Sequence, residues 1–570
     1  MILMNSTKLI TYTIVLLMLT ITTTALGQHT TPLSAPPAPV RQPAEFDQMT
    51  GVLIRYPFGI NYDVIAEMAE NVTVCTIVAS QTEKTSVLGQ YTSHGVDTDH
   101  CTFLIAPTDS YWTRDYGPWF IFTGDNTQGI VDFTYNRPRP NDDQIPTRYG
   151  QNQSITVYNM ALTATGGNYM CDGEGNAIST TLVWEENPGM THQQINQTVH
   201  DYLGINHYMV VPDVNSEYIK HIDCWGKYLS PDTILIRSVP TSHSQYHAIE
   251  NAVAYFKNQT DCYGTPYHVV RVYTPNDEPY TNSLILDNKV FVPIVGDQYD
   301  DDALQSYQDA MPGYEVLGFT GTWESTDALH CRAMGITDRD MLYIHHIPLQ
   351  NQTASSSGFP VQAYVYPYSG QDLVLGSPSL IYRVNGGPWA TLSMQSIGNH
   401  NYTATIPSQS GGSVVSYYVK AEDLSSRIAY HPYIGQDDAY TFTVINHAPE
   451  KPQTPQGNAT GSPKQTYTFV TQTTDQDNNN LSYKWDWGDG TTSDWTGSYA
   501  SGAVATAQHA WEKKGTYSVR VKAKDVFGLE SAWSNPLPVK MPLSLGWSWR
   551  DILQERFPVL FWLLSHHSRW

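Results

Sequence analysis

Two neighbouring segments, YHAIENAVAYFKN at residues 246–258 and HVVRVYTP at residues 268–275, predict a helix followed by a strand. Apolar residues recur at helical spacing in the first segment, and β-branched residues are concentrated in the second. The same pattern occurs in four more pairs of segments, at 63–71 and 72–80, 82–91 and 101–107, 193–203 and 207–214, and 302–312 and 314–319. Helices that alternate with such strands indicate an α/β domain, and five similar units favour a closed, pseudo-fivefold arrangement over an open sheet.

The chain ahead of this domain has a different character. Residues 1–27 combine a positive charge, a mainly apolar run and small residues at 25–27, which predicts a signal peptide and therefore a secreted or cell-surface protein. Residues 28–43 contain five prolines and no periodicity, so we interpret them as a linker. The α/β domain is then expected to span residues 44–352.

Beyond the α/β domain the sequence alternates short strands and turns without helices. Residues 360–446 and 453–541 are each predicted to form an all-β, immunoglobulin-like sandwich. In the second of them, WDWGDG at 485–490 and the later His509-x-Trp511 resemble the PKD domain. The tail at 542–570 is predicted as one short amphipathic helix broken at Pro558, which either serves sorting or docking or packs on the neighbouring sandwich.

The composition narrows the range of partners. The 570 residues include 31 Lys and Arg and 54 Asp and Glu, a formal net charge of −23. This balance argues against nucleic acid, which needs a basic face, and favours a cationic substrate. The six cysteines are too few and too scattered for a disulfide scaffold, and none has zinc-ligand spacing, so no metal site is expected. After the signal peptide, no stretch is long and apolar enough to span a bilayer.

Polar residues follow the predicted strands of the α/β domain at equivalent places. If the strands are parallel, their carboxyl ends share one face, and the loops that follow them converge there. The residues concerned are Asp115, His221, Asp223, Asn282 and Cys331.

Each of these residues also has an ordinary structural explanation. His221 and Asp223 are spaced i, i+2, which suits a simple structural contact, and Cys331 could be a small buried hydrophobe. Asp115 beside Arg114 could be a surface ion pair. Their recurrence in equivalent loops favours a shared pocket instead.

The residue types suggest a reaction. A cysteine and a histidine together indicate covalent catalysis. Two aspartates in one pocket would suit a guanidinium, because this planar group stays charged and offers N–H forks that match carboxylates. The bound cation or a charged His221 would also increase the thiolate fraction of Cys331, since a free thiol with a pKa of about 8.5 is mostly protonated at pH 7.

Longer motifs carry a family resemblance. The chain resembles the guanidino-group-modifying superfamily, whose catalytic domain is a five-bladed α/β propeller, and more closely secreted bacterial peptidylarginine deiminase. The resemblance spans roughly residues 44–420, and its motifs are SYWTRDYGPWF around Asp115, YNRPRPNDD at 135–143, GGNYM at 166–170, HIDCWGKYL from His221, YTNSLIL around Asn282 and DALHC ending at Cys331.

The resemblance implies a role for each site residue. Cys331 is implied as the nucleophile, His221 as the general acid and base, Asp115 and Asp223 as the guanidinium ligands, and Asn282 as their support. The implied reaction converts the arginine of peptides or proteins, preferably a C-terminal arginine, to citrulline, without metal or organic cofactor. In this family an arginine pair binds the substrate α-carboxylate, and aromatic and apolar residues line the pocket; the matching residues are Arg137, Arg139, Trp112, Tyr218 and Ile219.

Several alternatives remain at this point. Agmatine deiminase shares the fold and chemistry but typically has a glycine-rich run where this chain has Ser325-Thr-Asp-Ala-Leu-His. The two arginines could also pair simply with Asp142 and Asp143. An adhesion protein with a relic enzyme domain is possible because of the PKD-like module, and so is a cysteine protease, although a protease leaves the paired aspartates unexplained.

Overall fold

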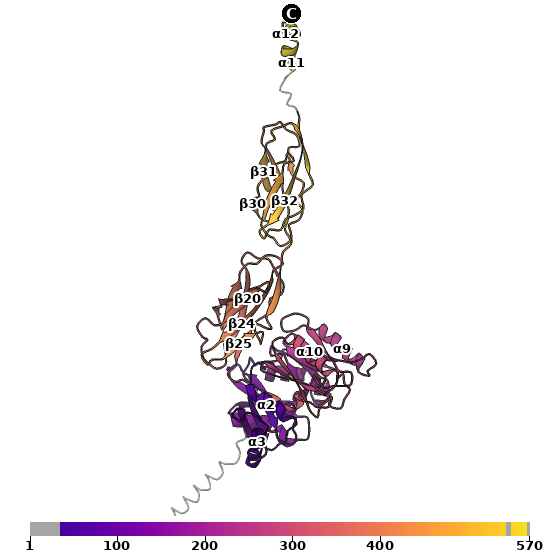
Figure 1. Cartoon of the computed structure of the whole chain (residues 1–570), viewed down its shortest axis with the longest axis vertical. Coiled ribbons are helices and arrows are strands. Elements are labelled where there is room, and N and C mark those ends of the chain that lie inside the picture. Colours follow the sequence, from indigo (N-terminus) through magenta and orange to yellow (C-terminus); the bar gives the residue numbers. More distant parts are fainter. Residues whose placement is uncertain (1–34, 543–548, 567–570) are drawn as a thin grey trace, which may run out of the picture.

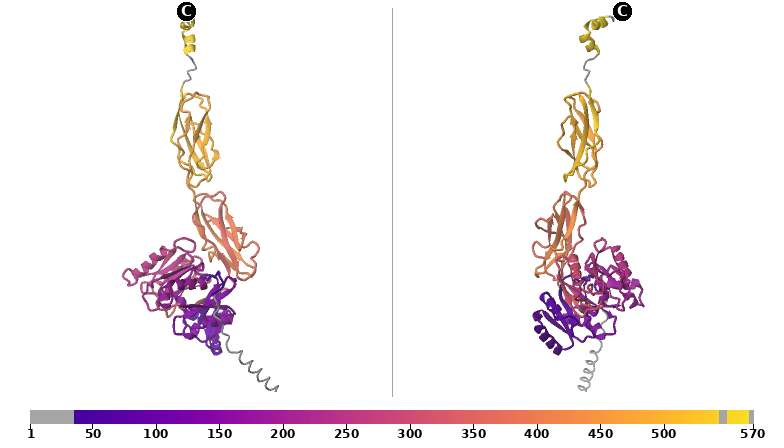
Figure 2. Two further views of the ribbon diagram at one scale, coloured as in Figure 1. Left: turned by 180° about the vertical axis from the view of Figure 1, so that it is seen from behind. Right: turned by 45° about the vertical axis from the view of Figure 1, so that its right-hand side comes forward.

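The computed structural model describes residues 35–542 and 549–566. The predicted signal peptide, residues 1–27, lies outside the described residues. Figure 1 shows an elongated molecule in which the α/β domain is followed by two β-sandwiches in line and then by the C-terminal helices. Figure 2 shows from two further sides that the sandwiches follow one another as separate bodies.

Five small mixed sheets build the α/β domain, and each contains one antiparallel pair followed by at least one parallel pair. The first sheet, in the order β16-β1-β2-β3, consists of β1 (Met49–Arg55), β2 (Thr73–Val78), β3 (Cys101–Ile105) and β16 (Met334–Thr337). The others are β4 (Trp119–Phe122), β5 (Gln128–Tyr135) and β6 (Thr156–Ala164); β7 (Met170–Cys171), β8 (Asn176–Thr180) and β9 (His207–Val211); β10 (Gly226–Ser230), β11 (Thr233–Ser238) and β12 (His268–Tyr273); and β13 (Leu284–Leu286), β14 (Lys289–Ile294) and β15 (Glu315–Thr320).

Helices connect the parallel strands within each sheet. They are α2 (Tyr62–Asn71) and α3 (Gln81–Ser93) in the first sheet, α5 (Pro140–Asp143) and α6 (Ile145–Gln153) in the second, α7 (Leu182–Glu185) and α8 (His192–Leu203) in the third, α9 (Tyr246–Lys257) in the fourth and α10 (Asp300–Ala310) in the fifth. Local sequence explains their ends; for example, Thr191 and Gln194 form a reciprocal capping box at the start of α8, and Gly204 with φ 72° ends it.

The five predicted helix–strand pairs all form, but they are distributed differently among the sheets. The pairs at 63–80 and 82–107 lie in the same sheet, because β1, β2 and β3 are successive parallel neighbours. The helices of the second sheet were missed. Their sequence, PNDD and then IPTRYGQNQ, is short and polar and lacks the apolar stripe on which the prediction relied.

The end of the predicted linker belongs to the domain. Arg41 exchanges two backbone hydrogen bonds with Phe122, at 2.9 and 2.8 Å, and Gln42 and Pro43 are buried. A chain segment that was predicted to be irregular therefore enters the interior of the α/β domain.

Two sandwiches follow, each made of two sheets. The first contains β17 (Leu342–His345), β18 (Gln352–Thr353), β19 (Phe359–Pro367), β20 (Ser379–Val384), β21 (Ala390–Ser393), β22 (Gln395–Gly398), β23 (Asn401–Ile406), β24 (Val414–Glu422), β25 (Ile428–His431) and β26 (Tyr440–Ile445). The second contains β27 (Gln456–Gly457), β28 (Tyr467–Thr471), β29 (Leu481–Asp486), β30 (Thr496–Tyr499), β31 (Ala505–His509), β32 (Gly515–Asp525) and β33 (Leu537–Met541). The first sandwich thus takes β17 and β18 from residues that the sequence analysis placed at the end of the 44–352 domain or just after it.

The tail contains two helices, α11 (Trp549–Arg556) and α12 (Pro558–His566), so the second helix starts at the proline where a break was predicted. None of the helices in residues 35–542 and 549–566 combines the length and the apolar character that a bilayer crossing needs.

The first sandwich packs firmly against the α/β domain. Phe122 stacks on Tyr368 with ring centroids 3.7 Å apart, and Arg427 donates a fork of two hydrogen bonds to Asp338. These contacts fix the position of the first sandwich against the α/β domain.

A buried histidine in this sandwich predicts a pH-dependent stability. His346 Nδ1 lies 2.6 Å from the Gln362 carbonyl and must donate, while Nε2 lies 2.9 Å from the Tyr417 hydroxyl, which can donate to a neutral ring. Burial lowers the pKa of His346 from 6.5 to about 4. Below pH 6.5 only the unfolded chain takes up this proton, so stability should fall by up to about 3 kcal/mol between pH 6.5 and 4.

Denaturant unfolding of the wild type and of His346→Gln across pH 4–8 checks this expectation. The stability difference between the two proteins should shrink as the pH falls, because the variant has no proton to exclude. Parallel curves across this range would contradict the assignment.

Candidate active site

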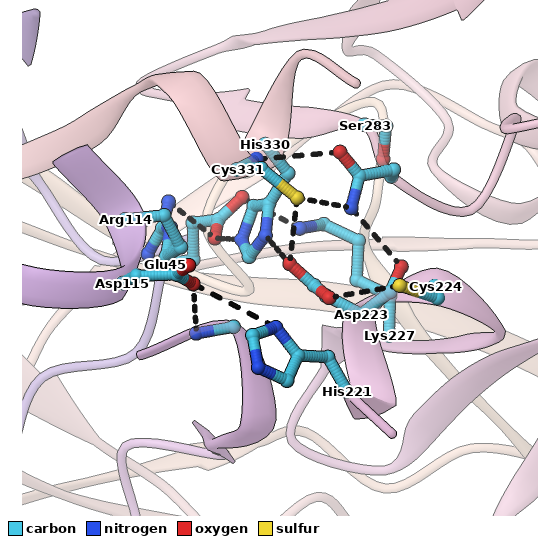
Figure 3. Close-up of polar contacts among 12 residues, drawn as sticks. Glu45, Arg114, Asp115, His221, Asp223, Cys224, Lys227, Ser283, His330 and Cys331 are labelled. Carbon is cyan, nitrogen blue, oxygen red and sulfur yellow. Dashed lines mark hydrogen bonds and ion pairs between the residues drawn. The ribbon is translucent and has the colours of Figure 1, made fainter. Parts of the chain in front are cut away.

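Four loops that follow parallel strands bring the predicted site residues together (Figure 3). The short helix α4 (Thr113–Tyr116), beyond β3, carries Asp115. The 3₁₀ turn η3 (Ile222–Cys224), beyond β9, carries Asp223 and directly follows His221. Asn282 lies beyond β12, and the turn η4 (His330–Arg332), beyond β15, carries Cys331.

Cys331 is held between Asp223 and Asn282. Its Sγ lies 3.7 Å from Oδ2 of Asp223 and 3.3 Å from Nδ2 of Asn282, and its backbone N–H donates to Oδ1 of Asn282 at 3.3 Å. Cys331 is 2% exposed and Asn282 is 1% exposed. The amide of Asn282 therefore fixes both the backbone and the sulfur of Cys331 next to a carboxylate.

His221 faces the second carboxylate. Its Nδ1 lies 3.7 Å from Oδ1 of Asp115, and within the described part of the chain neither ring nitrogen has a hydrogen-bond partner, although the side chain is 1% exposed. A buried imidazole with two unused polar atoms is available to exchange protons with a bound molecule.

Gly167, in the loop after β6, makes this approach possible. Its N–H donates to Oδ1 of Asp115 at 3.3 Å. A Cβ on this residue would lie 2.5 Å from Nδ1 of His221, 2.8 Å from Oδ1 of Asp115 and 3.2 Å from Oδ2 of Asp223. No side chain fits at this position, so the GGNYM motif supplies space at the centre of the site.

The two carboxylates have opposite electrostatic surroundings. Burial raises the pKa of Asp115, although the charges of His221 and Arg137 oppose the shift. Burial would also raise the pKa of Asp223, but the hydrogen bond and charge of His330 outweigh it, and the pKa lies below its ordinary value. Burial, followed by the charges of Asp223 and Asp115, raises the pKa of Cys331 well above the ordinary thiol value. The site therefore disfavours a thiolate until a cation enters.

This arrangement suits the capture and attack of a flat cation. Asp115 and Asp223 can accept hydrogen bonds from the N–H groups of a guanidinium. The thiol of Cys331, next to Asp223, can then attack the guanidinium carbon. No group of three His, Cys, Asp or Glu side chains in residues 35–542 and 549–566 is placed to hold a metal ion.

The comparison with protein families agrees with this chemistry. A family model described as Porphyromonas-type peptidyl-arginine deiminase matches residues 41–335, which contain Asp115, His221, Asp223, Asn282 and Cys331, and a PKD-domain model matches residues 446–540. The chain belongs to the Porphyromonas-type peptidyl-arginine deiminase family. Its α/β domain is the deiminase domain, and the protein is a deiminase-family enzyme that acts on guanidino groups.

Individual proteins are similar to the deiminase domain. A protein of Mycoplasma mycoides, provisionally named agmatine deiminase, is 25% identical over 250 residues, which cover 36% of this chain and 69% of that protein. The structure of the agmatine deiminase of Enterococcus faecalis aligns with a TM-score of 0.48 at 20% identity and covers 54% of this chain and 99% of that one. A protein of Porphyromonas gingivalis, provisionally named arginine deiminase, aligns with a TM-score of 0.47 at 18% identity and covers 52% and 98%.

The predicted arginine pair of the deiminase domain lies next to the site. Arg139 stacks on the ring of Trp112 at 4.3 Å and donates to the Tyr135 hydroxyl at 3.1 Å. In the described residues neither Arg137 nor Arg139 forms an ion pair with Asp142 or Asp143. Those two carboxylates instead accept hydrogen bonds from Ser110 and from the backbone of Asp109 and Tyr135. The alternative of a simple pairing with these acids is therefore wrong.

The other two predicted pocket residues differ from each other in position. Tyr218 is 81% exposed, whereas Ile219 is partly buried against the core of the deiminase domain. Both lie in the loop between β9 and His221, and their place in a substrate pocket stays a prediction.

Sequence reasoning missed a set of buried charges behind Asp223. His330 contacts Asp223, and Glu45 contacts His330. Arg114, which could have been a surface partner of Asp115, is instead buried and pairs with Glu45 at 3.0 Å. The DALHC motif contained a signal for His330, but no local pattern marks Glu45, which belongs to the proline-rich start of the domain.

A cavity of about 80 Å³ lies on the Glu45 side of Asp223. Glu45, Arg114, Lys227 and His330 line it together with apolar side chains, whereas Cys331 and His221 are not part of its wall. The charges behind Asp223 therefore line this cavity, and Asp223 itself is part of its wall.

Proposed function

We propose that the protein hydrolyses the guanidinium of arginine, preferably a peptide C-terminal arginine, to citrulline and ammonia through a covalent intermediate on Cys331. The observation that carries this proposal is the meeting of one thiol, one unpartnered imidazole and two buried carboxylates in a deiminase-family domain.

The reaction begins with binding of the cation between Asp115 and Asp223. The positive charge offsets the two carboxylates that raise the pKa of Cys331, so the thiol gives its proton to His221 more easily when substrate is present. The sulfur then attacks the guanidinium carbon and gives a tetrahedral adduct. His221 donates a proton to the departing nitrogen, and ammonia leaves.

The second half of the reaction releases the product. The carbon remains bound to Cys331 as a thiouronium, which keeps its positive charge between the two carboxylates. Water replaces the departed ammonia, His221 removes its proton, and attack on the carbon forms a second adduct. Collapse of that adduct breaks the carbon–sulfur bond and releases citrulline.

Two features support a substrate with a carboxylate. The chain has a net charge of −23, and a pair of arginines beside a cation-binding site needs an anionic partner. The second feature is the loop before Cys331, which has no glycine-rich run of the kind typical of agmatine deiminases, whose substrate has no carboxylate. Arg332 holds this loop by two hydrogen bonds of 2.8 Å to Asp327.

Agmatine deimination is the second candidate. It is favoured by the similarity to proteins that carry the agmatine deiminase name, at 25% identity for the Mycoplasma mycoides protein. Citrulline formation from a peptide with a free C-terminal arginine, compared with the same peptide amidated and with carbamoylputrescine formation from agmatine, separates the candidates. Faster turnover of agmatine than of the free-acid peptide would reject the peptide proposal.

The arginine pair gives a specific prediction. Arg139→Ala and Arg137→Ala should each raise KM for the free-acid peptide by about 10- to 100-fold, the loss expected for hydrogen bonds to a charged group. KM for the amidated peptide should change by less than about threefold. Arg383→Ala is the matched control, because Arg383 stacks on Trp389 at 4.5 Å in the first sandwich, as Arg139 does on Trp112. Equal effects on both peptides would contradict carboxylate binding.

We further propose that the five sheets are the blades of a five-bladed α/β propeller and that the protein is exported. The repeated antiparallel and then parallel pairing supports the first proposal. The composition of residues 1–27 supports the second, and N-terminal sequencing of the mature protein tests it: a start after Gly27 supports export, and retention of Met1 rejects it.

A further inference from the structure

A row of buried charges extends from Asp223 to the start of the domain (Figure 3). Oδ2 of Asp223 lies 2.7 Å from Nδ1 of His330, and Nε2 of the same ring lies 2.6 Å from Oε2 of Glu45. His330 and Asp223 are each 5% exposed, and the side chain of Glu45 is 15% exposed. One imidazole therefore bridges two carboxylates.

The protons of this bridge follow from its partners. Burial alone would raise the pKa of Glu45, but the charges of Lys227, His330 and Arg114 hold it well below its ordinary value. Asp223 is held low in the same way by His330. Two ionised carboxylates can only accept hydrogen bonds, so both nitrogens of His330 must donate and the ring carries a positive charge.

Glu45 is fully used in this arrangement. Its Oε1 accepts from Nζ of Lys227 and from the backbone N–H of Ile285, both at 2.7 Å. Its Oε2 receives His330 and pairs with Arg114 at 3.0 Å. A single carboxylate thus joins segments that are far apart in the chain and holds His330 at a fixed angle.

We propose that Glu45 and His330 are positioning residues, which keep Asp223 oriented and ionised beside Cys331. The inference rests on the proposed function, in which Asp223 binds the guanidinium. Asp223 shares its Oδ2 between His330 and the sulfur of Cys331, so any rotation of its carboxylate would move the guanidinium away from the thiol.

Other titratable groups also face the site. Asp115 lies near His221 and Arg137, and the sulfur of Cys224 lies 3.6 Å from Oδ1 of Asp223. The charge of Asp327 acts on Cys331 together with those of Asp223 and Asp115. Because the hydrogen bond and charge of His330 lower the pKa of Asp223, loss of that charge would leave Asp223 easier to protonate.

Two variants test the proposal. His330→Gln and Glu45→Gln should each lower kcat/KM for arginine substrates by about 10- to 100-fold, the range for a lost hydrogen bond to a charged group. Both should move the acidic limb of the pH profile to higher pH, because Asp223 then protonates more readily. The double variant should be little worse than either single one, since both residues act through one bridge.

Glu67→Gln is the matched control. Glu67 pairs with Lys289, another buried lysine, away from the site, and Lys289 keeps Glu70 as a partner at 3.3 Å. The activity and pH profile of Glu67→Gln should remain those of the wild type. A general loss of stability in the test variants would lower the amplitude of the profile without moving its acidic limb.

A measurement without substrate separates this inference from the proposed function. In protein labelled with ¹⁵N-histidine, the signal that disappears in His330→Gln should show both ring nitrogens protonated in the wild type and only one in Glu45→Gln. A neutral His330 in the wild type, or folded variants with an unmoved acidic limb, would overturn the inference. A charged His330 in a wild type that is inactive on every guanidino substrate would reject only the proposed function.

Discussion

Replacing Cys331 by alanine is expected to lower kcat by at least about 10⁴-fold, because no other group can form the covalent intermediate. The two carboxylates remain in this variant, so arginine substrates should still bind. Citrulline assays and calorimetric titration of the variant with a C-terminal-arginine peptide measure the two quantities separately.

Cys75→Ala is the control for this experiment. Cys75 is another buried thiol, located in β2 away from the site, and its loss should leave kcat within about twofold. Residual turnover above about 1% in Cys331→Ala, with the same product, would mean that a water molecule attacks the guanidinium directly. The covalent route would then be wrong.

Asp115→Asn and Asp223→Asn should have the second largest effect. Each aspartate offers the guanidinium about two charge-assisted hydrogen bonds, worth about 3–6 kcal/mol together. Their loss corresponds to about 10²- to 10⁴-fold in kcat/KM. The reactivity of Cys331 should change in the opposite direction, because the charges of Asp223 and Asp115 help to raise the pKa of that thiol.

Opposite changes in the reactivity of Cys331 and in turnover distinguish loss of the guanidinium ligands from a general distortion of the site. Alkylation of Cys331 by iodoacetamide at pH 8, followed by mass spectrometry, should be faster in both variants than in the wild type, while citrulline formation falls. Asp132→Asn replaces a carboxylate outside the site, bonded to Thr147, and should change neither rate. Slower alkylation together with slower turnover would indicate a distorted site instead of a lost cation clamp.

The sequence predicted the α/β class because the helix and strand periods are strong in segments such as α9 and β12. It did not assign the pairs to sheets, since the register between β1, β2 and β3 depends on contacts that no local period encodes. The polar helix α6 was missed for a related reason: it packs on β5 and β6 through few apolar residues.

The candidate site could likewise be predicted from the sequence only in part. Asp115, His221, Asp223, Asn282 and Cys331 follow strand ends, so topology alone suggested that they converge. The structure places Cys331, Asp223 and Asn282 in contact with one another and His221 beside Asp115. Their catalytic roles stay predictions. Glu45 could not be found in this way, because it follows no strand and its partners His330, Lys227 and Arg114 are known only from the folded chain.

The pairing of β1 with β16 connects the beginning and the end of the deiminase domain. During synthesis Glu45 emerges first among the elements of the deiminase domain, whereas Cys331 and β16 emerge last among them, and a contact between such distant segments forms late in folding. A chain that ends before Cys331, on the ribosome or after truncation, thus contains Asp115 and Asp223 but no nucleophile. An unfinished deiminase domain is therefore expected to be inactive on guanidino groups.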